Sequence, residues 1–336
     1  MKKNIIVLFS MGLVLLLQGC NFANPMSYFK SSDSSRLEAS SEETSTQEET
    51  TSSSNSSVIN TNESNTDNQE TIKEIIEEVN DNKSLLVYSI GNSLATDTNT
   101  VTIDEDTFSI NYDNYEISNA NALETADLIK IETALSDSLS SNDYLIVVTN
   151  TQTSEELSYF LNLTLSSENK VAVISTDISE DKYAITDSDI TNYLNQLKTS
   201  TLSANVLGAK LGEDLANVCA NPVSNDNKID ISDLKDLAYV SIVYDYLGND
   251  GEILEKAISN SDGIILVTTN YSGELSETAN EIINSNYSGV PVIIVSANSN
   301  TSVDNYHTAT QSRILLSLAI AKDKSMDEIK EYFTTY

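Results

Sequence analysis

The chain has 336 residues and a formal net charge of −33 at pH 7, from 51 acidic and 18 basic side chains. This charge argues against nucleic-acid binding, because a phosphate backbone requires clustered lysine and arginine. It equally disfavours charge-driven binding to an anionic lipid surface. The length is sufficient for two ordinary domains. The two cysteines, Cys20 and Cys219, lie far apart and predict no disulfide framework.

The first twenty residues have the pattern of a signal peptide. Lys2 and Lys3 precede an apolar stretch that reaches Leu17, and the stretch ends in Leu17-Gln18-Gly19-Cys20. This ending resembles the lipobox of bacterial lipoproteins, which implies cleavage before Cys20 and attachment of acyl chains to it. The alternative is an ordinary signal peptide with a chance cysteine.

Two or more acyl chains give stable membrane anchoring. The expected location is therefore extracytoplasmic, with the cell membrane as a partner through the lipid on Cys20. Residues 21–82 follow and are rich in Ser, Thr, Asn and Glu, and the stretch 31–68 contains hardly any apolar side chain. Such a composition cannot bury enough surface to offset its ordering entropy, so we expect a disordered tether.

The remainder of the chain predicts an α/β protein with a first domain over 83–222. Apolar runs of strand length alternate with segments of helical periodicity. The expected strands cover 84–90, 108–117, 145–148 and 170–174, and the expected helices cover 123–139, 154–165 and 185–197.

A linker over 223–236 separates this domain from a second one, over 237–336. Here the expected strands cover 240–244, 262–267 and 290–295, and the expected helices cover 251–258, 276–284 and a helix pair in 311–336. Strands alternating with helices predict right-handed βαβ units on a parallel sheet.

One segment, 144–165, combines several signals. The apolar run 145–148 leads into the polar turn 149–153, and a helix begins at Ser154-Glu155-Glu156. This arrangement places polar side chains at the carboxyl end of a strand and beside a helix N-terminus, where open α/β sheets bind their ligands.

The same segment resembles the second signature of the bacterial L-asparaginase/glutaminase family. In that family, a strand leads into a His-Gly-Thr-Asp-Thr turn, a Glu-Glu pair and Tyr-Phe-Leu. Thr151, the Glu-Glu pair and Tyr159-Phe160-Leu161 match. The His position reads Asn150, the Gly is absent, and the Asp position reads Gln152.

The resemblance extends to most of the chain after residue 83. The family's first signature, Thr-Gly-Gly-Thr after a strand, corresponds here to Gly91-Asn92-Ser93, and the segment 230–336 is also similar. The resemblance implies a two-domain asparaginase-like fold, with helices flanking a parallel sheet in the first domain and a smaller parallel sheet in the second. It also implies a homo-oligomer.

The family's reaction is hydrolysis of the side-chain amide of asparagine or glutamine through an acyl-enzyme. By resemblance, Ser93 and Thr151 occupy the positions of the catalytic hydroxyls. The resemblance places substrate-binding groups at Gly91, Asn92, Asn119 and Gln152. Three of these residues also have a simpler interpretation. Ser93 and Asn119 are suited to capping a helix, and Thr151 is suited to a turn.

No residue cluster has metal-ligand spacing, and no phosphate-binding glycine loop is present, so we expect neither metal nor cofactor. The lone histidine, His307, has polar sequence neighbours, which predict a surface loop.

Two departures bear on activity. Glutamine at 152 offers no full charge to a substrate ammonium, and the loss of such a charge-assisted bond costs about 1.5–3 kcal/mol. The family's relay lysine has no counterpart in 199–217, where we predict no strand; the nearest lysines are Lys198 and Lys210.

Three hypotheses follow. The first is an asparaginase-like lipoprotein with weak or lost amidohydrolase activity that binds a small polar ligand such as asparagine or glutamine. The second is an active amidohydrolase that uses Ser93 and Thr151. The third is a solute-binding lipoprotein that supplies a transporter.

Overall fold

The larger sheet of the computed structural model has the strand order β3-β4-β1-β5-β6-β8-β9. The structure describes residues 83–91, 94–96, 98–117, 123–176, 184–270, 274–286, 289–297 and 307–336. The predictions for the signal peptide, Cys20 and the tether lie outside these residues, as do Asn92, Ser93 and Asn119.

Five central strands of this sheet run parallel, and each edge carries one antiparallel strand. The strands are β1 (Lys83–Ile90), β3 (Thr100–Ile103), β4 (Asp106–Tyr115), β5 (Tyr144–Asn150), β6 (Val171–Thr176), β8 (Val206–Lys210) and β9 (Ala216–Asn217). The inner strands are buried on both faces, which explains their almost continuous apolar sequences.

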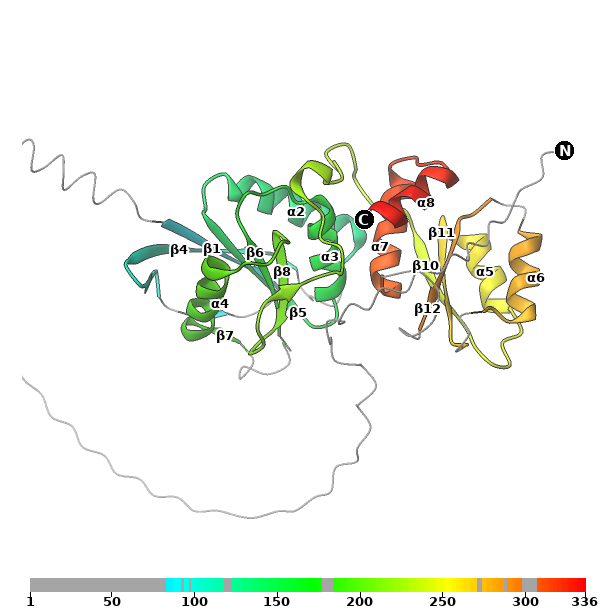
Figure 1. Cartoon of the computed structure of the whole chain (residues 1–336), viewed down its shortest axis with the longest axis horizontal. Helices are drawn as coiled ribbons and strands as arrows, with labels where there is room; N and C mark the ends of the chain where they lie inside the picture. The colour runs from blue at the N-terminus through cyan, green and yellow to red at the C-terminus, as the bar shows by residue number, and fades with distance from the viewer. Residues whose placement is uncertain are drawn as a thin grey trace, which may run out of the picture. The chain divides into compact units, whose positions relative to one another are not determined.

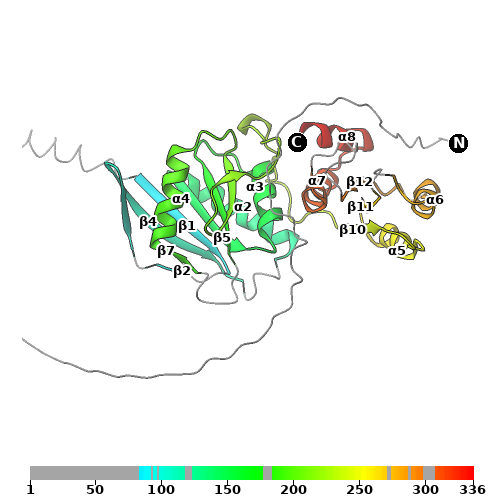
Figure 2. The same cartoon turned by 60° about the horizontal axis from the view of Figure 1, so that its bottom comes forward.

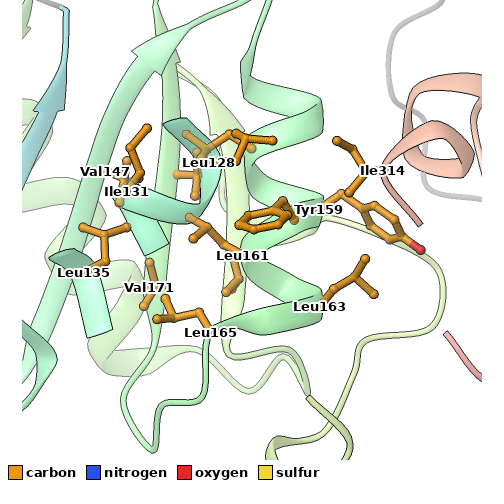
Figure 3. Close-up of a cluster of buried hydrophobic side chains, with 14 of the residues drawn as sticks. Leu128, Ile131, Leu135, Val147, Tyr159, Leu161, Leu163, Leu165, Val171 and Ile314 are labelled. Carbon is orange, nitrogen blue, oxygen red and sulfur yellow. The ribbon is translucent and has the colours of Figure 1, made fainter. Parts of the chain in front are cut away.

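Helices cover both faces of the sheet (Figures 1 and 2). Helices α2 (Thr125–Leu139) and α3 (Ser154–Thr164) contribute to the hydrophobic cluster that contains Leu145 and Val147 of β5. Helix α4 (Asp187–Thr199) packs in the cluster on the opposite face. Figure 3 shows the first cluster, with side chains of α3 between those of α2 and Ile314.

The smaller sheet consists of three parallel strands, β10 (Val240–Asp245), β11 (Gly263–Thr268) and β12 (Val292–Ser296). Helices α5 (Glu252–Asn260) and α6 (Glu277–Ser285) share one hydrophobic cluster with it, and α7 (Ala309–Ala321) and α8 (Met326–Thr335) share another. The short strands β2 (Leu94–Ala95) and β7 (Ile185–Thr186) pair with each other, and η3 (Asn225–Asn227) is a single 3₁₀ turn. None of the described helices is both long enough and apolar enough to cross a bilayer.

The α/β fold with two parallel-strand sheets is confirmed, and each predicted element is present with small shifts at its ends. The prediction that 199–217 contains no strand is wrong, because β8 and β9 both lie there. Gly208 interrupts the apolar run of β8, and a glycine in a short run is a poor strand signal. In the fold, a Cβ at Gly208 would lie 3.1 Å from Cγ1 of Val218, the residue after β9, so this close approach favours glycine.

Gly251 caps the N-terminus of α5 with φ of 83°, a conformation that costs an L-residue about 1–2 kcal/mol. A Cβ there would also lie 2.2 Å from Ile282 Cδ1. We therefore expect Gly251→Ala to lower the free energy of unfolding by about 1–2 kcal/mol from strain alone, with a further loss from this contact. Gly212, with φ of 88°, is the matched control, because a Cβ added there would meet no atom within 4 Å. Urea unfolding should show a larger loss for Gly251→Ala than for Gly212→Ala, and equal losses would contradict the steric argument.

Candidate active site

Buried polar side chains gather where β1, β5 and β6 end at the carboxyl edge of the larger sheet. Each is at most 4 % exposed, and the set is Ser89, Thr149, Asn150, Ser175 and Thr176. The strands are neighbours, and their register places Thr149 beside Ser175 and Asn150 beside Thr176. An apolar sheet therefore becomes polar at the edge where α/β proteins bind ligands.

The turn after β5 is held by its own side chains. Asn150 Oδ1 accepts hydrogen bonds from the backbone N–H of Thr153 at 2.8 Å and from its hydroxyl at 2.7 Å. The Thr149 and Thr153 hydroxyls lie 2.9 Å apart. Asn150 therefore shapes the turn from a buried position, whereas Thr151 and Gln152 at its tip are exposed.

Gly91 follows β1 in the left-handed region, with φ of 64°, and is exposed. Because β1 and β5 are parallel neighbours, Gly91 and the Thr151-Gln152 tip lie at the same sheet edge. Of the predicted site residues, the structure therefore brings together Gly91, Thr151 and Gln152.

The two carboxylates that follow the turn bind α7. Thr308, the N-cap of α7, donates from its hydroxyl to Glu155 Oε1 at 2.6 Å. Arg313 donates to Glu156 Oε1 from Nε at 2.7 Å and from Nη2 at 2.6 Å. Both glutamates also lie in the first turn of α3, where the helix dipole favours negative charge.

The prediction that His307 lies in a surface loop is wrong. His307 is 8 % exposed, its Nδ1 lies 3.2 Å from the Tyr159 hydroxyl, and its ring packs against those of Tyr159 and Phe333. Burial lowers its pKa to about 4. The polar neighbours of His307 in the sequence gave no sign that α3 and α8 cover it.

Known proteins resemble this chain in sequence and in fold. No family model matches the chain. The chain is 24% identical over 260 residues to L-asparaginase 2 of Bacillus subtilis (strain 168), an alignment that covers 62% of this chain and 69% of that protein. Its fold matches a crystal structure of a probable cytoplasmic L-asparaginase from Campylobacter jejuni with a TM-score of 0.60 and 18% identity, over 76% of this chain and 100% of that one. The chain is thus similar in sequence to an L-asparaginase and has an asparaginase-like fold.

Lys198 and Lys210, the two lysines nearest to the predicted relay position, lie in different parts of the fold. Lys198 Nζ lies 3.2 Å from Asp104 and 2.9 Å from Asp106, at the β3–β4 hairpin. Lys210 is the last residue of β8, paired with Ser175 and two strands from β5. With neighbouring strands about 4.8 Å apart, its backbone is about 10 Å from β5. Of the two, only Lys210 lies at the carboxyl edge.

Within the described residues, no group of three or more His, Cys, Asp or Glu side chains could hold a metal ion. The buried polar groups at the carboxyl edge of the larger sheet are instead hydroxyls and one amide.

Proposed function

We propose that this chain is an extracytoplasmic asparaginase-like lipoprotein, anchored through Cys20, that binds a small polar ligand at the carboxyl edge of its larger sheet and has weak or no amidohydrolase activity. The observation that carries the proposal is the neutral tip of the turn after β5. Thr151 and Gln152 are exposed there, and the next carboxylates along the chain, Glu155 and Glu156, are bound by Thr308 and Arg313.

A substrate ammonium at this turn would therefore meet an amide in place of a free carboxylate. Hydrogen bonds to charged groups are roughly twice as strong as neutral ones, so amino acids should bind weakly. A hydroxyl such as that of Thr151 also needs a base to become a nucleophile, and the amide of Gln152 cannot accept a proton for it. Both effects support a binding role over ordinary turnover.

The test is an ammonia-release assay with asparagine and glutamine on the full chain. We expect turnover far below the range of roughly 1–10³ s⁻¹ that is typical of enzymes, and turnover within that range would overturn the proposal. Thermal shift with the same amino acids reports binding without chemistry.

The second candidate is an active amidohydrolase, favoured by the position of Thr151 at the exposed tip of the turn. This version also requires Ser93 as nucleophile. If ammonia release is found, Ser93→Ala should abolish it, and activity that survives this change would exclude Ser93 from the chemistry.

Replacing Gln152 with aspartate should restore a charge at the turn. We expect the affinity for L-asparagine to increase by about tenfold or more, from the roughly 1.5 kcal/mol or more that separates a charged from a neutral hydrogen bond. Isothermal titration measures it, with Gln152→Asn as the neutral control of the same size as aspartate. Equal affinities for the two variants would show that residue 152 does not face the ligand's ammonium group.

The anchor is tested separately from the site. In a bacterial host, the full chain should partition with membranes and incorporate labelled fatty acid. Cys20→Ala should lose the label and leave the membrane fraction, because stable anchoring requires acyl chains. Label retained by Cys20→Ala would contradict a lipid on Cys20. The homo-oligomer stays a prediction, which light scattering of the purified protein can check.

A further inference from the structure

The smaller sheet has an open edge at β10. In the strand order β10-β11-β12, β10 pairs with β11 on one side, and within the described residues no strand pairs with its other side. The backbone carbonyls of Tyr239 and Asp245 accept hydrogen bonds from Asp262 and Thr269, the residues on either side of β11, at 2.8 and 3.2 Å. The odd-numbered residues from 239 to 245 therefore direct their backbone groups toward β11.

The even-numbered residues of β10 face the open side. Consecutive residues of a strand direct their N–H and C=O groups to opposite neighbours, so Val240, Ile242 and Tyr244 direct theirs away from β11. Ile242 at the centre of the strand is only half-buried, whereas its neighbour in β11, Ile265, is fully buried. Asn249 Nδ2 donates to the Tyr244 carbonyl at 3.5 Å, at the end of the edge. A row of outward backbone donors and acceptors is a template for an additional strand.

Strand β10 carries none of the features that protect such edges. Natural edge strands are kept short or carry lysine, proline or outward charges. β10 has six residues, whereas the edge strands β3, β9 and β12 have four, two and five, and Pro291 precedes β12. The one charged residue of β10, Asp245, is 4 % exposed, and its carboxylate accepts two hydrogen bonds from Ser276. A long and unguarded edge favours occupation by a partner.

An exposed tyrosine ring flanks the edge on each face of the sheet. Tyr244, 52 % exposed, shares its face with Val240, which packs in the cluster of α7 and α8. Tyr239, 63 % exposed, shares the opposite face with Val243, which packs in the cluster of α5 and α6. An added strand alternates its side chains between the two faces, so it offers a side chain to each ring. Lysine and arginine are the residues that bind over tyrosine faces.

The charge near the open edge is negative. At its start, exposed Asp262 accepts a hydrogen bond from the N–H of Tyr239 at 2.9 Å, and exposed Asp250 follows its end. The segment 237–262 contains five acidic residues and one basic residue, Lys256. A second copy of the chain would bring two such segments together, and their repulsion disfavours it. A basic partner has the complementary charge.

We propose that the open edge of β10 binds an extended, basic segment of a partner protein, which adds to the smaller sheet as a fourth strand. Its main chain bonds to the outward groups of Val240, Ile242 and Tyr244, the mode in which peptides bind exposed sheet edges. Its lysine or arginine side chains lie over the rings of Tyr239 and Tyr244 and near the carboxylates at the two ends of the edge. The surface belongs to the smaller sheet, so it is tested independently of the ligand proposed for the Thr151 turn.

The probe is a short synthetic peptide that alternates lysine and valine, titrated against the full chain by fluorescence anisotropy. We expect saturable binding. A peptide that alternates glutamate and valine should not bind, because its charge has the same sign as that of the segment 237–262.

One substitution tests the main-chain contacts. Ile242→Pro removes an outward N–H and no bond to β11, and proline is tolerated where the N–H of an edge strand faces solvent. The variant should bind the lysine peptide about tenfold more weakly, because one hydrogen bond is lost. Ile242→Val retains the N–H and is the matched control, which should bind like the wild type. Neither variant changes the charge of the chain, so non-specific attraction of the peptide stays the same.

Amide hydrogen exchange, followed by NMR, locates the bound strand without any variant. In the free protein, the amides of Ile242 and Tyr244 should exchange faster than those of Ser241 and Val243, which face β11. A saturating concentration of the lysine peptide should slow exchange at Ile242 and Tyr244 by about tenfold or more. Exchange at Ser241 and Val243 should change little.

Unchanged exchange at Ile242 and Tyr244 in the presence of the peptide would overturn the proposal. Equal binding of the two peptides would also do so, as would wild-type affinity in a folded Ile242→Pro variant. Circular dichroism shows whether this variant is folded, and the exchange measurement on the wild type decides the question if it is not. Light scattering tests for a second copy, since a dimer that Ile242→Pro dissociates would mean that the edge pairs with itself, against the proposal.

Discussion

Glu132→Gln should stabilise the protein by about 3 kcal/mol at pH 8 and leave its stability at pH 4 nearly unchanged. Glu132 lies on α2 and is 8 % exposed. Burial, with Asp137 and Asp230 nearby, raises its pKa from 4.5 to about 7. Because the pKa is higher in the folded state, the folded protein binds a proton that the unfolded chain releases. The free energy of unfolding of the wild type therefore decreases as the pH rises from about 4.5 to about 7. The glutamine of the variant does not titrate, so the variant does not show this decrease.

Urea unfolding at pH 4, 6 and 8 measures the effect as the difference between variant and wild type, which removes the background from the other 50 acidic residues. Glu281→Gln, on the exposed face of α6, is the control for the substitution itself and should change the free energy of unfolding little, because its side chain is exposed. A Glu132→Gln difference that does not grow between pH 4 and 8 would contradict a raised pKa.

His307 should make the protein less stable as the pH falls, which is the opposite direction to the effect of Glu132. Its pKa falls from 6.5 to about 4 on burial, so the unfolded chain binds a proton that the folded protein rejects. Stability is therefore lost as pH falls from about 6.5 to about 4, by about 3 kcal/mol in total. His307→Gln removes this titration, although it also loses the ring packing and should be less stable at pH 7.

The chain contains a single histidine, so NMR can follow its imidazole without ambiguity. We expect the His307 ring signals to stay constant between pH 8 and 5.5 and to shift only on further acidification. A midpoint near 6.5 would show that the imidazole is exposed and that Tyr159 does not cover it.

The fold could be predicted well from the sequence because the parallel strands carry their own signal. The runs 145–148 of β5 and 171–174 of β6 are apolar throughout, as expected for strands buried on both faces. Strand β8 could not be recognised, because the glycine at its centre, Gly208, weakens the strand pattern in the sequence. The reason for a glycine there is the close approach of Val218, which only the folded structure shows. Local patterns do not report such a contact.

The candidate site was predictable in position and less so in detail. The polar turn after an apolar run located Thr151 and Gln152 at a sheet edge, and the structure places them there. The partners of Glu155 and Glu156 could not be predicted, because Thr308 and Arg313 lie more than 150 residues further along the chain. Ser93 and Asn119 stay predictions, since they lie outside the described residues.

The contacts of α3 with α7 determine how the polypeptide could be divided into separately expressed pieces. Ile314, Leu315 and Leu318 of α7 belong to the same hydrophobic cluster as α3, and Arg313 neutralises Glu156. A fragment that ends at residue 236 would expose this apolar surface to water and leave a carboxylate without its counterion. Residues 237–336 would then act as an obligate complementing fragment, and soluble protein would form only when both pieces are co-expressed.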